Sequence, residues 1–98
     1  MSKSIIKNNY KGVCYICKRY GQTEEHHIFS GVANRKKAER DGLKVYLCHW
    51  CHNEPPNGVH FNKDRNNRLR QIGQKAWMEH YGKTIEDFIK EYGKNFIE

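Results

Sequence analysis

Two Cys-x-x-Cys pairs, separated by 30 residues, constrain this 98-residue chain more than any other feature. Each pair places two thiols in one tight turn, and two such turns supply the four ligands of a tetrahedral zinc site. A closed four-sulfur site leaves no position open for a substrate, so we interpret it as structural. The expected zinc ligands are Cys14, Cys17, Cys48 and Cys51.

Two disulfides would use the same four cysteines, and the cellular compartment decides between these alternatives. The N-terminal residues contain no apolar run long enough for a signal peptide or a membrane span, because Ile5 and Ile6 are followed directly by Lys7. We therefore expect a reduced, cytoplasmic protein that does not contact a membrane. In a short chain with 37% hydrophobic residues, zinc would also supply part of the missing core.

Positive charge is concentrated in the part of the chain that contains the cysteines. Residues 1–78 hold 15 Lys and Arg against 6 Asp and Glu, whereas residues 79–98 hold 3 against 5. This distribution favours a polyanionic partner. The candidates for contacts with its phosphates are Arg35, Lys36, Lys37, Arg65, Arg68 and Arg70.

The adjacent residues His26 and His27 fall in a predicted strand over residues 23–29, which is followed by a Ser-Gly turn signal. Neighbouring strand residues point to opposite faces, so one histidine can bind a metal while the other faces a different group. A second strand is predicted over residues 44–47, and two prolines with an Asn-Gly sequence predict a loop over residues 54–58.

Capping signals divide the rest of the chain into helices. Asn34 is predicted to cap a short helix, and Thr84 begins a Thr-x-x-Asp capping sequence. Gly42, Gly82 and Gly93 are predicted to end helices, because glycine adopts the left-handed conformation readily. The predicted helices cover residues 34–40, residues from about 60 to 81, where Leu69, Ile72, Ala76 and His80 form a stripe, and residues 84–92.

Four histidines near the cysteines have no role in a four-sulfur site: His26, His27, His52 and His60. Neutral imidazoles suit zinc, nickel, copper or iron better than magnesium. Three of them would form a partly open metal site with room for a phosphate oxygen and water. The alternative is a surface histidine cluster without a metal. We interpret His49 and His80 as ordinary solvated residues.

Two short motifs together resemble the HNH endonuclease family in its zinc-knuckle form. They are Glu-His-His-Ile at residues 25–28 and Leu-Cys-His-Trp-Cys-His-Asn at residues 47–53. The sequence Gly-Val-His-Phe-Asn at residues 58–62 is similar to small phage HNH proteins associated with recombination. The resemblance covers roughly residues 12–65 and implies a zinc knuckle and ββα-metal core there. The length suits a single domain, in which the polar and basic residues 1–11 are expected to form a flexible arm and residues 66–98 a helical part.

The resemblance also implies a role for each histidine. His27 would be the general base that takes a proton from water, and His60 would lie on a metal-binding helix. The implied ligands of a catalytic Mg²⁺, Mn²⁺, Zn²⁺ or Ni²⁺ ion are His26, His52 and His60. Hydrolysis of DNA phosphodiester bonds is the implied reaction, with phage or host recombination proteins as further partners.

The chain departs from the family pattern in two places. Seven residues separate His52 from His60, so the two cannot share one regular helical turn. Either the intervening loop folds back and both bind the metal, or only one of them is a ligand. The family's middle Asn, expected a few residues before Leu47, is absent.

Two other functional classes are compatible with the same residues. The first is a zinc-stabilised nucleic-acid-binding module without catalytic activity, for which the absent Asn is the best argument. The second is a protein-interaction adaptor that uses the acidic C-terminal helices as its contact face.

Overall fold

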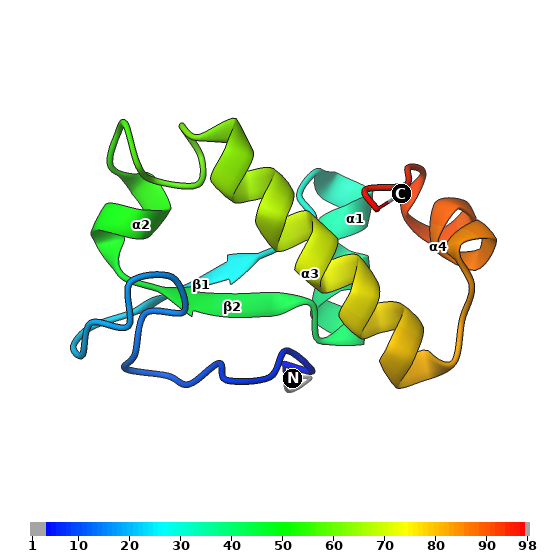
Figure 1. Cartoon of the computed structure of the whole chain (residues 1–98), viewed down its shortest axis with the longest axis horizontal. Helices are drawn as coiled ribbons and strands as arrows, with labels where there is room; N and C mark the ends of the chain where they lie inside the picture. The colour runs from blue at the N-terminus through cyan, green and yellow to red at the C-terminus, as the bar shows by residue number, and fades with distance from the viewer. Residues whose placement is uncertain (1–3, 98) are drawn as a thin grey trace.

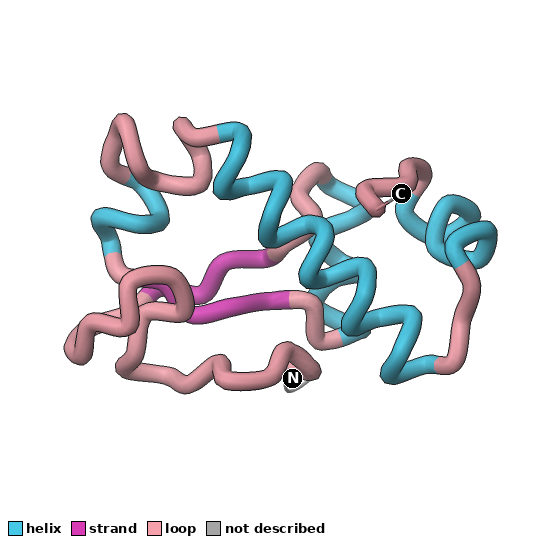
Figure 2. Tube along the Cα trace, viewed as in Figure 1, coloured by secondary structure: helices cyan, strands magenta, loops and turns pink. Residues whose placement is uncertain are grey.

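The computed structural model describes residues 4–97, which form a two-stranded antiparallel sheet and four helices (Figure 1). The elements are β1 (Glu24–His27), α1 (Val32–Asp41), β2 (Lys44–Leu47), α2 (His49–Asn53), α3 (Lys63–Tyr81) and α4 (Ile85–Tyr92). The long helix α3 runs obliquely past one end of the two strands, and α1 connects the strands (Figure 2). The small α+β architecture predicted from the sequence is confirmed.

The register of the two strands determines what each histidine of the pair faces. His26 stands opposite Val45, and His27 stands opposite Lys44. Residue pairs that face each other across a sheet lie on the same face, and successive pairs alternate between the two faces. His26 is 5% exposed and packs with other histidines, whereas His27 contacts Glu39 of α1. The pair therefore separates onto two faces, as predicted.

Residues 4–9 lie along the outer edge of β2, where the sequence predicted a loosely held arm (Figure 2). The amide of Ile5 donates to the carbonyl of Gly42, just before β2, at 2.9 Å. The side chain of Asn9 accepts from the amide of Tyr46 in β2 at 2.9 Å. Ile6 is 6% exposed and belongs to the core. The apolar pair within the polar segment therefore anchors it. Residues 1–3 of the predicted arm lie outside the described residues.

Helix α3 packs closely against the two residues that follow β1. A Cβ at Gly73 would lie 3.0 Å from Cγ2 of Ile28 and 3.2 Å from the ring of Phe29, so glycine permits this approach. The stripe predicted on α3 contacts the core except at His80, which is exposed. Although α3 has 19 residues, no helix within residues 4–97 is long and apolar enough to cross a membrane.

The predicted helix ends are confirmed where capping chemistry is strong. Gly42, Gly82 and Gly93 follow α1, α3 and α4 with φ values of 78°, 63° and 89°. The capping box of α4 is complete, because the Thr84 hydroxyl accepts from the Asp87 amide and the Asp87 carboxylate accepts from the Thr84 amide. Local sequence alone therefore determines these boundaries.

Two other boundary predictions are wrong, and one helix was not predicted. Helix α1 begins at Val32 without a side-chain cap, and Asn34 lies inside it, where its amide donates to the C-terminal end of α4 at 3.3 Å. Helix α3 begins after Asn62, whose side chain accepts from an α3 amide at 3.1 Å, and not near His60. The five-residue helix α2 was not predicted, because it is too short to show helical periodicity.

Asp41, the last residue of α1, joins α1 to α3 and α4. Its Oδ2 accepts from Trp77 Nε1 at 3.0 Å and from the Tyr92 hydroxyl at 2.7 Å, while Tyr81 donates to its carbonyl. Burial opposes ionisation of this carboxyl, but the hydrogen bonds, led by that from Arg40, outweigh burial and hold its pKa below the ordinary value. Asp41 is therefore a charged group that stabilises the packing of three helices.

We predict that Asp41→Asn lowers the free energy of unfolding at pH 7 by roughly 1–3 kcal/mol, because the amide accepts fewer hydrogen bonds. A carboxyl with a depressed folded pKa stabilises the fold above its unfolded pKa of about 3.9, and this stabilisation disappears as the pH falls through the folded value. The difference between variant and parent should therefore shrink below about pH 4. Urea titrations at several pH values would measure it.

The matched control is Glu79→Gln, which removes a carboxylate from an exposed ion pair with Lys7. It should change the free energy of unfolding by less than about 0.5 kcal/mol at every pH. Protonation of metal ligands at low pH affects parent and variants alike. A difference between Asp41→Asn and parent that stays constant with pH would contradict the role of the ionised carboxylate.

Candidate metal centres

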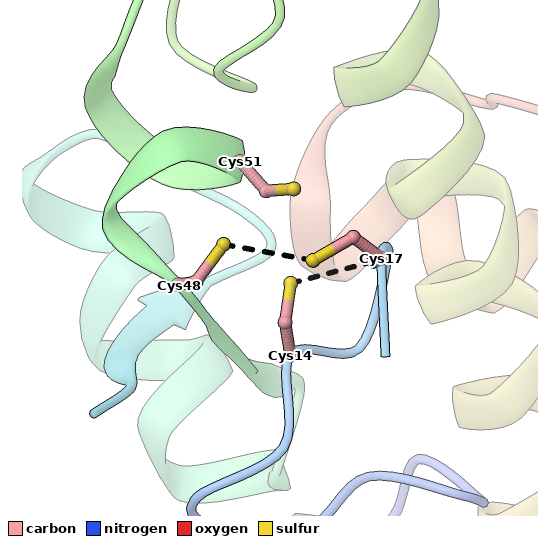
Figure 3. A group of neighbouring side chains, drawn as sticks. All are labelled: Cys14, Cys17, Cys48 and Cys51. Carbon is pink, nitrogen blue, oxygen red and sulfur yellow. Dashed lines mark hydrogen bonds between the residues drawn. The ribbon is translucent and has the colours of Figure 1, made fainter. Parts of the chain in front are cut away.

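Four cysteine sulfurs converge between the hairpin over residues 10–20 and the start of α2 (Figure 3). One ligand atom of each of Cys14, Cys17, Cys48 and Cys51 lies within 4.8 Å of the others. The Cys17 and Cys48 sulfurs are 3.7 Å apart, which excludes a disulfide between them. Tetrahedral zinc with bonds of about 2.3 Å separates its sulfurs by about 3.8 Å. The four thiols are therefore placed to hold a zinc ion.

The hairpin that carries the first cysteine pair is fastened to the sheet by its backbone. The Tyr15 amide donates to the carbonyl of Tyr46 in β2 at 2.8 Å. The Cys17 amide donates to the Cys14 sulfur at 3.5 Å, and Lys18 closes the turn with a φ of 65°. The second pair enters α2 directly from β2, so zinc would join the hairpin to the first turn of α2.

The cysteine sulfurs differ in electrostatic environment. Burial would raise the pKa of Cys14, but amide hydrogen bonds, led by that from Cys48, outweigh burial and lower the pKa to about 6. Burial and the neighbouring sulfurs raise the pKa of Cys51 to about 12. An Arg65 guanidinium nitrogen lies 4.0 Å from the Cys51 sulfur. A dication at the centre would favour the thiolate form of all four.

We predict that Cys14→Ser or Cys48→Ser unfolds the domain, because zinc binding to a four-cysteine site contributes on the order of 10 kcal/mol of apparent folding free energy. Circular dichroism melting and zinc content per chain would measure the effect. His49→Ala, which removes an exposed side chain from the same turn of α2, is the control and should retain zinc and parental stability. Near-parental melting of either cysteine variant would contradict a structural zinc site.

Three histidines form a second cluster on the other side of α2. His26 comes from β1, His52 from α2 and His60 from the loop before α3, and one ring nitrogen of each lies within 4.8 Å of the others. The Nε2 atoms of His52 and His60 are 3.0 Å apart. The Nε2 atom of His26 is buried and has no hydrogen-bond partner among residues 4–97. A cation bound by the three imidazoles would satisfy this nitrogen.

Glu24 determines which nitrogen of His52 faces the cluster. Its Oε1 lies 2.8 Å from His52 Nδ1 and accepts a hydrogen bond from the side-chain Nδ2 of Asn53 at 3.1 Å. The bond to His52 is the main cause that lowers the pKa of Glu24, so the carboxylate accepts and Nε2 of His52 is left for a metal. Burial, aided by the charges of His52 and His60, lowers the pKa of His26 to about 3 and keeps its imidazole neutral.

The loop before α3 folds back on α2 and brings His60 beside His52. A Cβ at Gly58 would lie 2.8 Å from backbone atoms of Glu54 and 3.0 Å from the His52 carbonyl, so only glycine fits at this crossing. The Nε2 atoms of His52 and His60 therefore lie side by side, although seven residues separate the two histidines in the sequence. His60, which the HNH resemblance implied on a helix, lies in the loop instead.

On the opposite face of β1, His27 belongs to a third cluster, with two glutamates and a lysine. His27 Nε2 lies 2.9 Å from Glu39 Oε1 and 3.8 Å from Glu25 Oε1. Lys44 Nζ lies 2.8 Å from Glu39 Oε2 and 3.5 Å from Glu25 Oε1. The ammonium thus occupies the position between the two carboxylates that a metal ion would take. Alternation along β1 could have identified Glu25, but no sequence signal identified Glu39.

A hollow of about 240 Å³ is lined by side chains from both faces of β1. Its lining consists of Glu25, His26, His27, Ser30, Arg35, His52 and His60. A neighbouring hollow of about 580 Å³ also includes His27 and Arg35 and adds Lys36. The smaller hollow is therefore lined by the candidate general base, the three candidate metal ligands and a positively charged arginine.

The basic candidates do not form a single surface. Arg35 and Lys36 line the hollows beside His27, whereas the Lys37 ammonium donates to the carbonyl of Glu91 in α4 at 2.6 Å. The other three candidates belong to α3. Arg65 and Arg68 line a separate hollow beside the cysteine hairpin, and the Arg70 guanidinium lies over the ring of Phe96. Arg35 and Lys36 accompany the histidines, and the charge of Arg70 also acts on His26, whose pKa is lowered mainly by burial.

Comparisons with known proteins gave no match to a family model, a curated protein or a solved structure. The likeness to HNH endonucleases therefore rests on the short motifs in the sequence. The geometry of the cysteine and histidine clusters carries the functional argument.

We predict that His26→Ala loses a second, weaker divalent ion and retains the structural zinc, because its buried nitrogen belongs to the histidine cluster alone. Glu24→Ala should weaken that ion's binding by roughly 10- to 100-fold, because His52 loses its orienting carboxylate. Calorimetric titration of the zinc-loaded protein with Ni²⁺ would measure both. His80→Ala is the control, since His80 is exposed and outside the cluster. Parental Ni²⁺ affinity in His26→Ala would contradict the assignment.

Proposed function

We propose that this protein is a metal-dependent HNH endonuclease that hydrolyses phosphodiester bonds of DNA. The observation that carries the proposal is the hollow where a candidate base, three candidate ligands and an arginine meet: His27, His26, His52, His60 and Arg35. In this proposal β1, β2 and α2 form the ββα-metal core, and the four cysteines hold a structural zinc that fastens α2.

The donor set of the histidine cluster fits a divalent ion, as the unpartnered nitrogen of His26 indicates. Three imidazoles favour Zn²⁺ or Ni²⁺ over Mg²⁺. When bound, such an ion stabilises the negative charge that develops on the phosphate and on the leaving oxygen. The three imidazoles that would hold the ion line the hollow, which would admit a phosphate oxygen.

The chain's own residues perform the proton transfer and the positioning. His27 takes a proton from a water molecule, whose oxygen then forms a bond to phosphorus. The bond from phosphorus to the leaving sugar oxygen breaks, and that oxygen takes a proton from solvent, which yields a phosphate monoester and a hydroxyl end. Arg35 and Lys36 beside the hollow attract the phosphate backbone of the DNA and hold it in place without contacting its bases.

We predict that His27→Ala reduces cleavage by roughly 10² to 10⁴, because the general base is lost, while metal and DNA affinity stay near parental values. His26→Ala should lose the weakly held ion and cleavage together. Nicking of supercoiled plasmid under single-turnover conditions, with Mg²⁺, Mn²⁺, Zn²⁺ or Ni²⁺ added, would measure cleavage. His80→Ala is the control and should cut like the parent.

Each outcome distinguishes the candidates. If His27→Ala loses the metal and His26→Ala retains it, then His27 is the metal ligand and His26 is the general base. Parental cleavage by both variants, or no cleavage by the parent with any of the metals, would remove the nuclease proposal. DNA binding that persists in that case would favour the zinc-stabilised binding module without catalytic activity.

A further inference from the structure

We propose that Glu39 and Lys44 are positioning residues for His27. Glu39 holds the Nε2–H of His27 and leaves Nδ1 as the nitrogen that accepts the proton from water. Lys44 determines which oxygen of Glu39 makes this contact. The catalytic consequence rests on the nuclease proposal, whereas the tautomer of His27 is a property of the folded protein alone.

The three residues come from three elements whose placement is determined by the fold. His27 ends β1, Lys44 stands opposite it at the start of β2, and Glu39 lies in the last turns of α1, which connects the strands. The contacts are 2.9 Å from His27 Nε2 to Glu39 Oε1 and 2.8 Å from Lys44 Nζ to Glu39 Oε2. The His27 side chain is 13% exposed and that of Lys44 is 4% exposed. His27 and Lys44 are therefore largely shielded from solvent, whereas the Glu39 side chain is 35% exposed.

The charge of Glu39 determines the direction of its hydrogen bond to His27. Hydrogen bonds from Lys44 and then His27 lower the pKa of Glu39 to about 2, so it is a carboxylate at neutral pH. A carboxylate only accepts hydrogen bonds, so His27 Nε2 must carry the hydrogen. A neutral imidazole has one lone pair, which then lies on Nδ1. The nitrogen that faces away from Glu39 is thus the one able to take a proton.

Lys44 gives this arrangement its specificity. An ammonium only donates, so it requires an acceptor, and it takes Oε2 of Glu39 and leaves Oε1 for His27. Glu25, on the same face as His27, lies 3.5 Å from the ammonium and supplies a second negative charge. A buried lysine needs such partners to remain charged. Lys44 therefore orients Glu39, and Glu39 orients His27.

The variant Glu39→Gln tests this chain of contacts, because an amide has one acceptor and one donor end. Lys44 will take the amide oxygen, so the NH₂ group will face His27 Nε2 and require its lone pair. The hydrogen of His27 then moves to Nδ1, where it blocks proton transfer from water. We expect cleavage to fall by roughly 10²-fold or more. Ni²⁺ content and DNA affinity should stay near parental values.

The double variant Glu39→Gln/Lys44→Met separates positioning from a merely structural role. Without the ammonium, the amide can turn and accept from His27 Nε2–H through its oxygen, which restores the lone pair on Nδ1. We expect it to cut roughly tenfold faster than Glu39→Gln, although it lacks one more native contact. A structural role predicts a slower double variant. Lys75→Met, on the exposed face of α3, is the matched lysine control.

Nitrogen-15 NMR of the imidazoles gives a readout that does not depend on cleavage. The His27 signals, assigned by their loss in His27→Ala, should show Nε2–H in the parent and the double variant and Nδ1–H in Glu39→Gln. An Nδ1–H form in the parent overturns the inference, even if no variant folds. An unchanged tautomer and unchanged cleavage in Glu39→Gln also overturn it. Correct tautomers without DNA cleavage by the parent support the positioning and reject the nuclease proposal.

Discussion

Four sulfur atoms within 4.8 Å of one another are the constraint on which the rest of this structure depends. As thiolates they repel one another, and as thiols they make only weak hydrogen bonds, so a dication is the partner that makes their convergence favourable. The hairpin over residues 10–20 contacts β2 through few backbone hydrogen bonds, and α2 has only five residues. Neither segment would hold its position through packing alone in a chain this short.

The alternation of a single short strand divides the chemistry between two faces. On one face His26 meets two other imidazoles, and its buried Nε2 has no partner among residues 4–97. On the other face the Lys44 ammonium lies between the carboxylates of Glu25 and Glu39 and offsets one of their two negative charges. One face therefore has donors without a cation, and the other already contains its cation. This difference is why we propose a metal for the first face and a base for the second.

Much of the architecture could be predicted from local chemistry, and the remainder depends on tertiary contacts. Both strands, the capping box at Thr84 and the glycine helix ends were predicted, because each is encoded within a few neighbouring residues. The cap at Asn34 was wrong, because its side-chain amide donates to the carbonyl of Tyr92 instead of accepting from an amide of its own helix. The role of Glu39 could not be predicted, since its contact with His27 spans 12 residues and joins α1 to β1. The fold-back at Gly58 depends on a backbone crossing that no sequence pattern records.

The cysteine and histidine clusters are coupled through α2, because Cys51 and His52 are consecutive residues of that helix. The loop that carries His60 is also held there, since the amide of Val59 donates to the carbonyl of Cys51 at 2.8 Å. Two of the three imidazoles are thus placed by the segment that a structural zinc would fasten. A closed four-sulfur site binds its ion far more tightly than an open three-nitrogen site. A zinc ion at the cysteines would therefore set the geometry in which the proposed second ion would bind, and not the reverse.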